Sequence, residues 1–452
     1  MTCTQLRFLL IALAIAVRFP LWIGYAPVVG GDTTTYERLA EQLLVWDFSK
    51  YTGARTPVYP LILLLCGGNY TVVVALQSFM GLATVWLVFE LTLRETASPR
   101  LAFAAGVATA LSLNLLLFEA SITTETISTF LVVLMLWLWR LALRADSVER
   151  SRYLFLIVGI TIGIVALTRP LLQFAAILIP ALTLYAFVMC CRKWRSGLIA
   201  SVCVFSPALL LLLGWSAFNK THINYFGITT LAGYSLSQHA GAVMERAPDE
   251  YKLLRDIYLK YRDARVIRTG THSMTIWEAY PEMMSATRKS FPLLSKEIGE
   301  MSTAVLLANP GSYLNTAFEA WIRFWKAPMS PSFLEPQAGY PWLLEALHRI
   351  WTVERYLLVA VKALFLLLAA LTLFRWIRSP RSISAVSMGI LAVVIGASLL
   401  QALAEYGENA RYSIPFQPLV FIGIACMIIR SRITVSSSGR DSSESSTILR
   451  GA

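Results

Sequence analysis

Acidic and basic side chains recur in the connections between long apolar segments of this chain of 452 residues. They are Asp32, Glu37, Arg55, Glu119, Glu125, Arg169, Glu405, Glu408 and Arg411. An arginine can grip a phosphate through two parallel hydrogen bonds, and a carboxylate can remove a proton from an attacking hydroxyl. Such a set suits a reaction on a phosphate-bearing substrate. The alternative is that each residue is an ordinary polar residue at a helix end, in contact with water or lipid headgroups.

The composition indicates which elements must position these residues. Hydrophobic residues make up 56% of the chain and charged residues 15%, whereas an ordinary globular protein has about 25% charged residues. The mean hydropathy is +0.61. A soluble protein cannot bury that much apolar surface, but separate membrane-spanning helices can. The sequence therefore predicts an all-α polytopic membrane protein.

Apolar segments long enough to cross a bilayer, or nearly so, predict about ten transmembrane helices of ~20 residues each. They are 6–24, 72–93, 101–118, 122–143, 153–168, 171–190, 197–218, 356–374, 383–403 and 413–430. The segment 57–68 is too short to span and contains two early prolines. We expect it to form an interfacial or re-entrant helix ahead of the second span.

Basic residues in the short connections predict the orientation. If the N-terminus is cytoplasmic, every short inside connection carries at least two arginines or lysines, whereas the short outside connections carry only Arg169 and Arg411. This asymmetry agrees with the positive-inside rule. It also accounts for most of the surplus of 39 basic over 27 acidic residues, so the net charge of +12 does not indicate a nucleic-acid partner.

Two longer segments face outward in this topology. The segment 25–71 is an outer loop, and 219–354 is the only long stretch of soluble composition, with helical periodicity that predicts a small, mainly helical outer domain. The predicted organisation is a transmembrane module at 1–218, this outer domain, further transmembrane helices at 355–430 and a Ser-rich, disordered cytoplasmic tail at 431–452.

Motifs for several common chemistries are missing. The sequence has no Gly-rich phosphate loop, no H-E-x-x-H and no G-x-S-x-G, and its six cysteines include no C-x-x-C pair. The cytoplasmic connections are too short to hold a nucleotide site. An active site must therefore lie outside, or at the outer membrane boundary.

Five short motifs occupy the outer connections. They are GDTTTYERLA from Gly31, RTPVYP from Arg55, Thr124-Glu125, LTRP ending at Pro170, and GENARYSIP from Gly407. In this order and on these connections, the chain resembles the bacterial lipid-linked-sugar glycosyltransferases of the GT-C superfamily, and more narrowly their protein-mannosyltransferase and aminoarabinose-transferase branch. The resemblance covers spans one to seven and the last pair of helices, while 219–354 carries no matching motif.

The resemblance implies a role for each matched residue. Asp32 matches the catalytic aspartate, the general base for the acceptor. Arg55, Arg169 and Arg411 are the expected ligands of the donor phosphate. The expected supporting residues are Tyr36, Tyr59, Glu125, Glu408 and Tyr412. Relatives often carry Asp-Glu in the first outer loop, whereas this chain has Asp32-Thr33, so we expect no cofactor and no metal site, with a divalent ion left open.

The resemblance implies an integral-membrane glycosyltransferase with a GT-C-like bundle. It would move a sugar from a polyprenyl-phosphate donor to a lipid, glycan or protein acceptor outside, with inversion. The implied location is the bacterial plasma membrane, with both termini cytoplasmic. A polytopic transporter or lipid-linked-sugar flippase stays open, although the one-sided charges and the lack of visible repeats argue against it. A non-catalytic subunit of the same fold also stays open. Convergence of Asp32, Glu125 and Arg411 beneath the outer domain would favour the enzyme.

Two basic residues fall inside predicted spans. Arg18, near the outer end of the first span, is expected to snorkel outward or to pair with Asp32. Lys362 is also expected to snorkel, with contact to a donor phosphate as the alternative.

Overall fold

The computed structural model describes residues 1–191, 193–328, 339–379 and 383–437, and no strand occurs among them. Among these described residues, nine helical segments are long and apolar enough to cross a membrane, and a bent pair makes up to ten. The segments are α1 (Cys3–Gly24), α4 (Tyr70–Thr96), α7 (Glu125–Leu143), α8 (Val148–Thr168), η1 (Pro170–Phe174) with α9 (Ala175–Ala186) and η2 (Phe187–Cys191), α10 (Trp194–Ile223), α16 (Pro341–Arg378), α17 (Ala385–Ala404), and η6 (Arg411–Phe416) with α18 (Gln417–Ser437). The bent pair is α5 (Pro99–Leu111) and α6 (Leu113–Glu119), which meet at 55°. The predicted all-α polytopic membrane architecture is confirmed.

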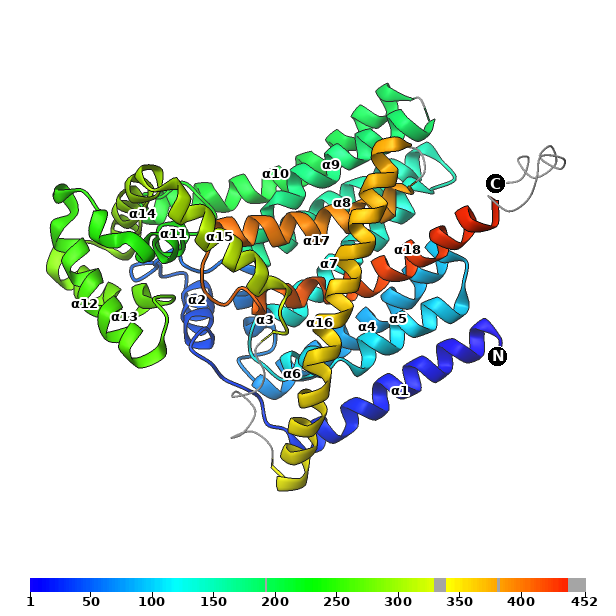
Figure 1. Cartoon of the computed structure of the whole chain (residues 1–452), viewed down its shortest axis with the longest axis horizontal. Coiled ribbons are helices and arrows are strands. Elements are labelled where there is room, and N and C mark those ends of the chain that lie inside the picture. Colours follow the sequence, from blue (N-terminus) through cyan, green and yellow to red (C-terminus); the bar gives the residue numbers. More distant parts are fainter. Residues whose placement is uncertain (192, 329–338, 380–382, 438–452) are drawn as a thin grey trace.

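The remaining helices lie at one end of this bundle. They are α2 (Thr33–Val45), α3 (Val58–Leu65), α11 (Ala232–Ala240), η3 (Gly241–Arg246), η4 (Asp249–Tyr251), α12 (Lys252–Thr269), α13 (Thr275–Thr287), α14 (Phe291–Ala308) and α15 (Pro310–Trp325). Figure 1 shows α11 to α14 grouped on the left, opposite the end at which α1 begins. The short helix α3 is the expected element ahead of the second span.

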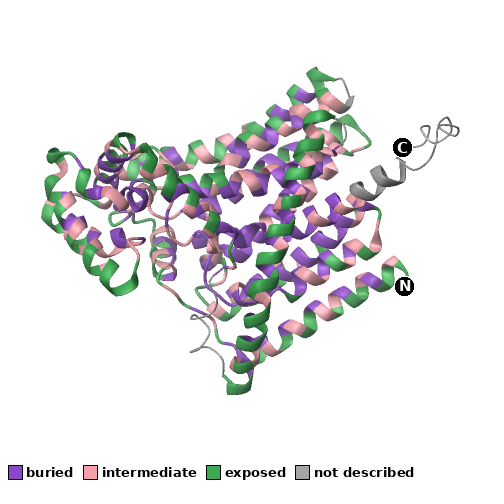
Figure 2. Cartoon of the chain, in the orientation of Figure 1, coloured by how far each residue is buried: buried purple, intermediate pink, exposed green. Residues whose placement is uncertain are grey.

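Helices α11 to α15, named the outer helices for their place at one end of the bundle, have a hydrophobic core of their own, which includes Tyr234, Tyr258, Met283 and Ile298. Helices α11 and α14 approach each other so closely that a side chain at Gly233 would overlap the backbone of Ser295. In Figure 2 the buried residues of the membrane bundle concentrate at its centre, and the far tip of the outer helices is largely exposed. The bundle therefore ends in a separately packed helical cap.

Two predicted boundaries differ from the structure. Helix α16 runs without interruption from Pro341 to Arg378, so it crosses the boundary expected between 354 and 355. Its 38 residues extend about 57 Å at 1.5 Å per residue, and Figure 1 shows it lying obliquely across the other spans. Helix α18 continues to Ser437, into the tail expected to be disordered from 431. The rest of that tail, 438–452, lies outside the described residues.

The bend between α5 and α6 occurs at Ser112, whose backbone is extended. The freed amide of Leu113 donates to both carboxylate oxygens of Glu354 on α16, at 2.9 and 3.0 Å. The hydroxyl of Ser112 accepts from the side chain of Gln417 at 2.7 Å. Since an unpaired backbone amide is costly within a membrane, these contacts stabilise the break and redirect α6.

Arg18 neither snorkels nor pairs with Asp32. Its side chain is 2% exposed, and its Nε and Nη2 donate to the two carboxylate oxygens of Glu119 at 2.9 and 2.5 Å. Gly81 leaves room for this pair, because a side chain there would overlap the Glu119 carboxylate. Removing one partner of a buried ion pair typically costs 3–5 kcal/mol, about as much as a large core truncation. The pair therefore fixes the end of α6 against α1.

The snorkelling expected for Lys362 is also wrong. The side chain is 3% exposed, and its ammonium donates to the carbonyls of Phe324 and Lys326 and to the hydroxyl of Ser413, at 3.4, 2.8 and 2.7 Å. Ser413 in turn donates to the Ala410 carbonyl. Lys362 therefore joins the end of α15 to η6.

Candidate active site

Asp32 lies at the start of α2, in the segment that joins α1 to α3. It is the N-cap residue of that helix, but its side chain makes no capping bond, so the carboxylate is free to face the neighbouring loops. Thr33, which follows it, is fully buried, and its hydroxyl donates to the carbonyl of Ile122 at 3.1 Å and accepts from the amide of Gly30. These contacts fix the direction of the Asp32 side chain.

The loop before Asp32 is paired with the connection between α6 and α7. Val28 forms a single parallel bridge with Ser121, through bonds from its amide to Ala120 at 2.8 Å and from the amide of Ile122 to its carbonyl at 2.9 Å. Glu125 begins α7 three residues after Ile122. The segments that carry Asp32 and Glu125, far apart in sequence, are thereby held at a fixed separation.

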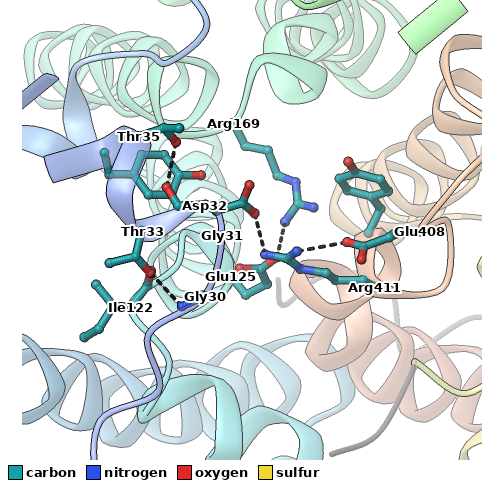
Figure 3. A network of polar contacts seen from close by, with 12 residues as sticks. Gly30, Gly31, Asp32, Thr33, Thr35, Ile122, Glu125, Arg169, Glu408 and Arg411 are labelled. Atoms are coloured by element: carbon teal, nitrogen blue, oxygen red, sulfur yellow. Dashed lines mark hydrogen bonds and ion pairs between the residues drawn. The ribbon is translucent and has the colours of Figure 1, made fainter. Parts of the chain in front are cut away.

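Arg411 is the point at which the acidic residues converge. Its Nε donates to Glu125 at 2.6 Å, its Nη2 to Asp32 at 3.2 Å and its Nη1 to Glu408 at 2.9 Å. Figure 3 shows the guanidinium between these three carboxylates, with Arg169 beside it. The contact with Glu408, three residues earlier in the chain, is thus one of three contacts with carboxylates.

Arg55 approaches Asp32 from the other side. Its Nη2 donates to Asp32 at 2.5 Å and its Nε to the hydroxyl of Thr35 at 2.8 Å. The guanidinium lies over the ring of Tyr36, with its carbon 4.6 Å from the centroid. Tyr59 packs edge-on against that ring at 4.9 Å. The two tyrosines thus support the arginine from below.

Arg169 completes the group at the turn between α8 and η1. Its Nη1 donates to Glu125 at 3.5 Å, and its guanidinium lies over the ring of Tyr412, 4.5 Å from the centroid. Every residue predicted for the site is therefore brought together at the end of the bundle that carries the outer helices.

The carboxylates that bind Arg411 differ in how far they are exposed to solvent. The side chain of Glu125 is 1% exposed, whereas those of Asp32 and Glu408 are 34% and 36% exposed. Burial alone would raise the pKa of the Asp32 carboxyl, but the guanidiniums of Arg55 and Arg411 outweigh burial and hold that pKa below its usual value. Asp32 is an accessible and ionised carboxylate.

Some residues of the site were not predicted from the sequence. Thr35 lies within the first motif, three residues after Asp32, and that spacing could have indicated it. Gln77 is fully buried on α4. It accepts from the hydroxyl of Tyr59 at 3.2 Å and donates to the carbonyls of Glu119 and Ser121, at 2.9 and 2.8 Å. No motif surrounds Gln77, so only the three-dimensional contact reveals it.

The carboxylates of the site do not form a metal-ligand set. In the described part of the chain no group of three or more His, Cys, Asp or Glu side chains is arranged to hold an ion. Asp32, Glu125 and Glu408 each face the guanidinium of Arg411 instead.

Known proteins share this arrangement of helices. Over 98% of its length the chain is similar to the archaeal oligosaccharyltransferase AglB from Archaeoglobus fulgidus, solved with an inhibitory peptide and a dolichol-phosphate, with a TM-score of 0.51 and 14% sequence identity. The chain has a GT-C fold. The fold implied by the motifs is thereby confirmed, although the chain spans only about half of AglB, 52% of its length.

A family model and a second solved structure also resemble the chain. Residues 58–218 match the family model described as dolichyl-phosphate-mannose-protein mannosyltransferase; that range includes Glu125 and Arg169 but not Asp32, Arg55 or Arg411. The enzyme ArnT from Cupriavidus metallidurans, bound to undecaprenyl phosphate, is more loosely similar, with a TM-score of 0.40 and 13% identity over 93% of this chain and 78% of ArnT. No curated protein matches the sequence significantly.

Proposed function

We propose that this protein is a glycosyltransferase that moves a sugar from a polyprenyl-phosphate donor to an acceptor hydroxyl. The observation that carries the proposal is the contact of Arg411 with both Asp32 and Glu125, with Arg55 and Arg169 beside them. One candidate base and three candidate phosphate ligands thus share one site at an end of a membrane bundle. The GT-C fold and the mannosyltransferase family model support the same reaction.

In the proposed reaction Asp32 accepts the proton of the acceptor hydroxyl. The acceptor oxygen forms a bond to the anomeric carbon of the sugar while the bond from that carbon to the phosphate oxygen breaks. The electron pair leaves with the lipid phosphate, and the arginines stabilise the charge that develops there. A phosphate leaves without a general acid, so one carboxylate suffices, unlike the two of a glycoside hydrolase.

Binding of the donor would change the pKa of Asp32, the proposed base. Arg411 makes three contacts with carboxylates, and a phosphate would compete with them for its N–H groups; the exposed Asp32 and Glu408 would be displaced more readily than the buried Glu125. When the phosphate shares the charge of Arg55 and Arg411, the effect that lowers the pKa of Asp32 weakens, and burial then raises that pKa. The donor would thereby make Asp32 a stronger base.

The deciding experiment offers purified protein a panel of polyprenyl-phosphate hexoses and pentoses with lipid, glycan and peptide acceptors. We expect one donor to be cleaved only when an acceptor is present, with release of polyprenyl phosphate and a gain of one sugar mass on the acceptor. Mass spectrometry of both products provides the measurement. Movement of an intact lipid-linked sugar across proteoliposomes, without cleavage, would show a flippase instead.

We further propose that the site faces the outside of a bacterial plasma membrane and that both termini are cytoplasmic. Alkaline phosphatase fused after residue 240, in α11, should be active, because the enzyme folds only outside the cytoplasm. A fusion after Lys193, between η2 and α10, should be inactive. The reverse pattern would place the site inside the cell.

A further inference from the structure

The outer helices hold the segment that leads into Arg411. The hydroxyl of Tyr313 on α15 donates to the carbonyl of Leu403 at 2.8 Å. The hydroxyl of Tyr406 donates to Glu319 at 2.7 Å and accepts from Arg323 at 2.6 Å, both on α15. Tyr406 is only 3% exposed. The 403–412 segment is therefore packed against the outer helices before it enters the membrane bundle.

One outer side chain reaches further toward the site. Gln238 on α11 is fully buried; its Nε2 donates to Glu405 at 3.4 Å and its Oε1 accepts from the amide of Met274 at 3.2 Å. Gly407 lies against this contact, because a side chain there would come within 2.8 Å of Gln238 and 3.1 Å of the sulfur of Met274. Met274 has a φ of 66°, which a non-glycine residue rarely adopts. The junction is closely fitted.

From Glu405 the contacts continue to an arginine of the site. The hydroxyl of Tyr412 donates to Glu405 at 3.2 Å, on the same carboxylate oxygen that accepts from Gln238. The ring of Tyr412 lies beneath the guanidinium of Arg169. An unbroken set of side-chain contacts thus runs from α11 through Glu405 and Tyr412 to Arg169, which binds Glu125.

We propose that Gln238 and Glu405 are positioning residues for the donor-phosphate site, a role that rests on the proposed function. Gln238 orients the Glu405 carboxylate, and Glu405 fixes the hydroxyl of Tyr412. The Tyr412 ring in turn holds the guanidinium of Arg169 in position. The outer helices therefore contribute to the binding of the lipid-phosphate donor, as well as covering the site. A ligand that moves α11 relative to the 403–412 segment would change donor affinity without touching the donor.

The test compares Gln238→Ala, Tyr412→Phe and the double variant, with kcat and KM measured separately for donor and acceptor. Each single change should raise the donor KM about 10-fold, less than the loss of a direct contact with the phosphate because both residues act through Arg169, and leave the acceptor KM within about twofold. Because both changes interrupt the same contacts, the double variant should resemble the singles and not show their product of about 100-fold.

Two controls separate positioning from general destabilisation. Glu405→Gln keeps an acceptor for Tyr412 and should raise the donor KM less than Glu405→Leu does. Lys260→Ala removes an exposed ion pair to Glu282 in the same outer helices and should not change the donor KM. Multiplying effects in the double variant, or lowered melting temperatures with an unchanged donor KM, would overturn the positioning role.

Direct binding distinguishes this proposal from the proposed function. Undecaprenyl phosphate in detergent is titrated into wild type and Gln238→Ala, with intrinsic tryptophan fluorescence as the signal. Tight binding by wild type and about 10-fold weaker binding by Gln238→Ala supports the positioning role. Equal binding by both proteins overturns the positioning role alone. Absence of binding to wild type overturns both proposals.

Discussion

Replacing Asp32 by Asn should lower the turnover number by about 10²- to 10⁴-fold, the usual contribution of a general base. Asn has the shape of Asp but cannot take the proton of the acceptor. Binding of undecaprenyl phosphate should be retained or become tighter, because the change also removes a carboxylate that competes for Arg55 and Arg411. The measurement is kcat at saturating donor and acceptor, together with a titration of the lipid phosphate.

Glu408→Gln is the matched control for this prediction. Glu408 and Asp32 are about equally exposed and both accept from Arg411, so either change frees the arginine for a phosphate. Only Asp32 is proposed to accept a proton, and Glu408→Gln should therefore keep kcat within a few-fold of wild type. Near-normal turnover of Asp32→Asn would place the base elsewhere, with Glu125 as the first substitute.

The pH dependence of the rate should also report Asp32 as the general base. In the free enzyme the arginines hold the pKa of Asp32 below its usual value, so kcat/KM should fall only when the pH drops through that lowered pKa. In the donor complex the phosphate shares the arginines, and the acid limb of kcat should lie at higher pH. The ion pairs of Asp32 also stabilise the fold above the pKa of its unfolded state, and this stabilisation is lost as the pH falls through the lowered pKa.

Hydropathy was sufficient to predict the architecture, and short motifs were sufficient to pick out residues that the fold brings together at one end of the bundle. Nine of the ten predicted segments correspond to spans in the described part of the chain and the tenth to the bent pair α5 and α6, because apolar length is the main determinant of which helices cross a bilayer. Asp32, Arg55 and Arg411 were predicted because each stands in a short pattern with fixed neighbours. Their convergence follows from the topology, which places all outer connections at one end of the bundle.

The contacts that the sequence could not predict join residues far apart in the chain. Arg18 was expected to reach water or Asp32, yet it meets Glu119, 101 positions away, because the break at Ser112 redirects α6. Lys362 is bound by two carbonyls at the end of α15, and a carbonyl leaves no mark in a sequence. Gln238 and Glu405 form part of no recognised motif, so the link between the outer helices and the site is visible only in three dimensions.

The second large effect is expected at Arg411. A local pair with Glu408 alone would tolerate lysine, which keeps the charge. The structure instead uses three nitrogens of one planar group for three carboxylates, and lysine has a single nitrogen on a flexible stem. Arg411→Lys and Arg411→Ala should therefore both weaken use of the donor. A lost charged hydrogen bond of ~2–3 kcal/mol corresponds to roughly 30- to 150-fold in the donor KM or rate.

Arg55→Ala should have a similar effect, because Arg55 shares the Asp32 carboxylate and is held in place by Thr35 and the ring of Tyr36. The measurement is a donor titration at saturating acceptor, with melting temperatures recorded in parallel. Arg140→Lys is the control, since Arg140 makes a comparable 2.7 Å pair with Glu95 far along α7 from the site, and its donor titration should match wild type. Unchanged donor kinetics in the Arg411 variants, with a lowered melting temperature, would reduce Arg411 to a structural residue. Arg169, held between Glu125 and Tyr412, would then be the remaining ligand for the phosphate.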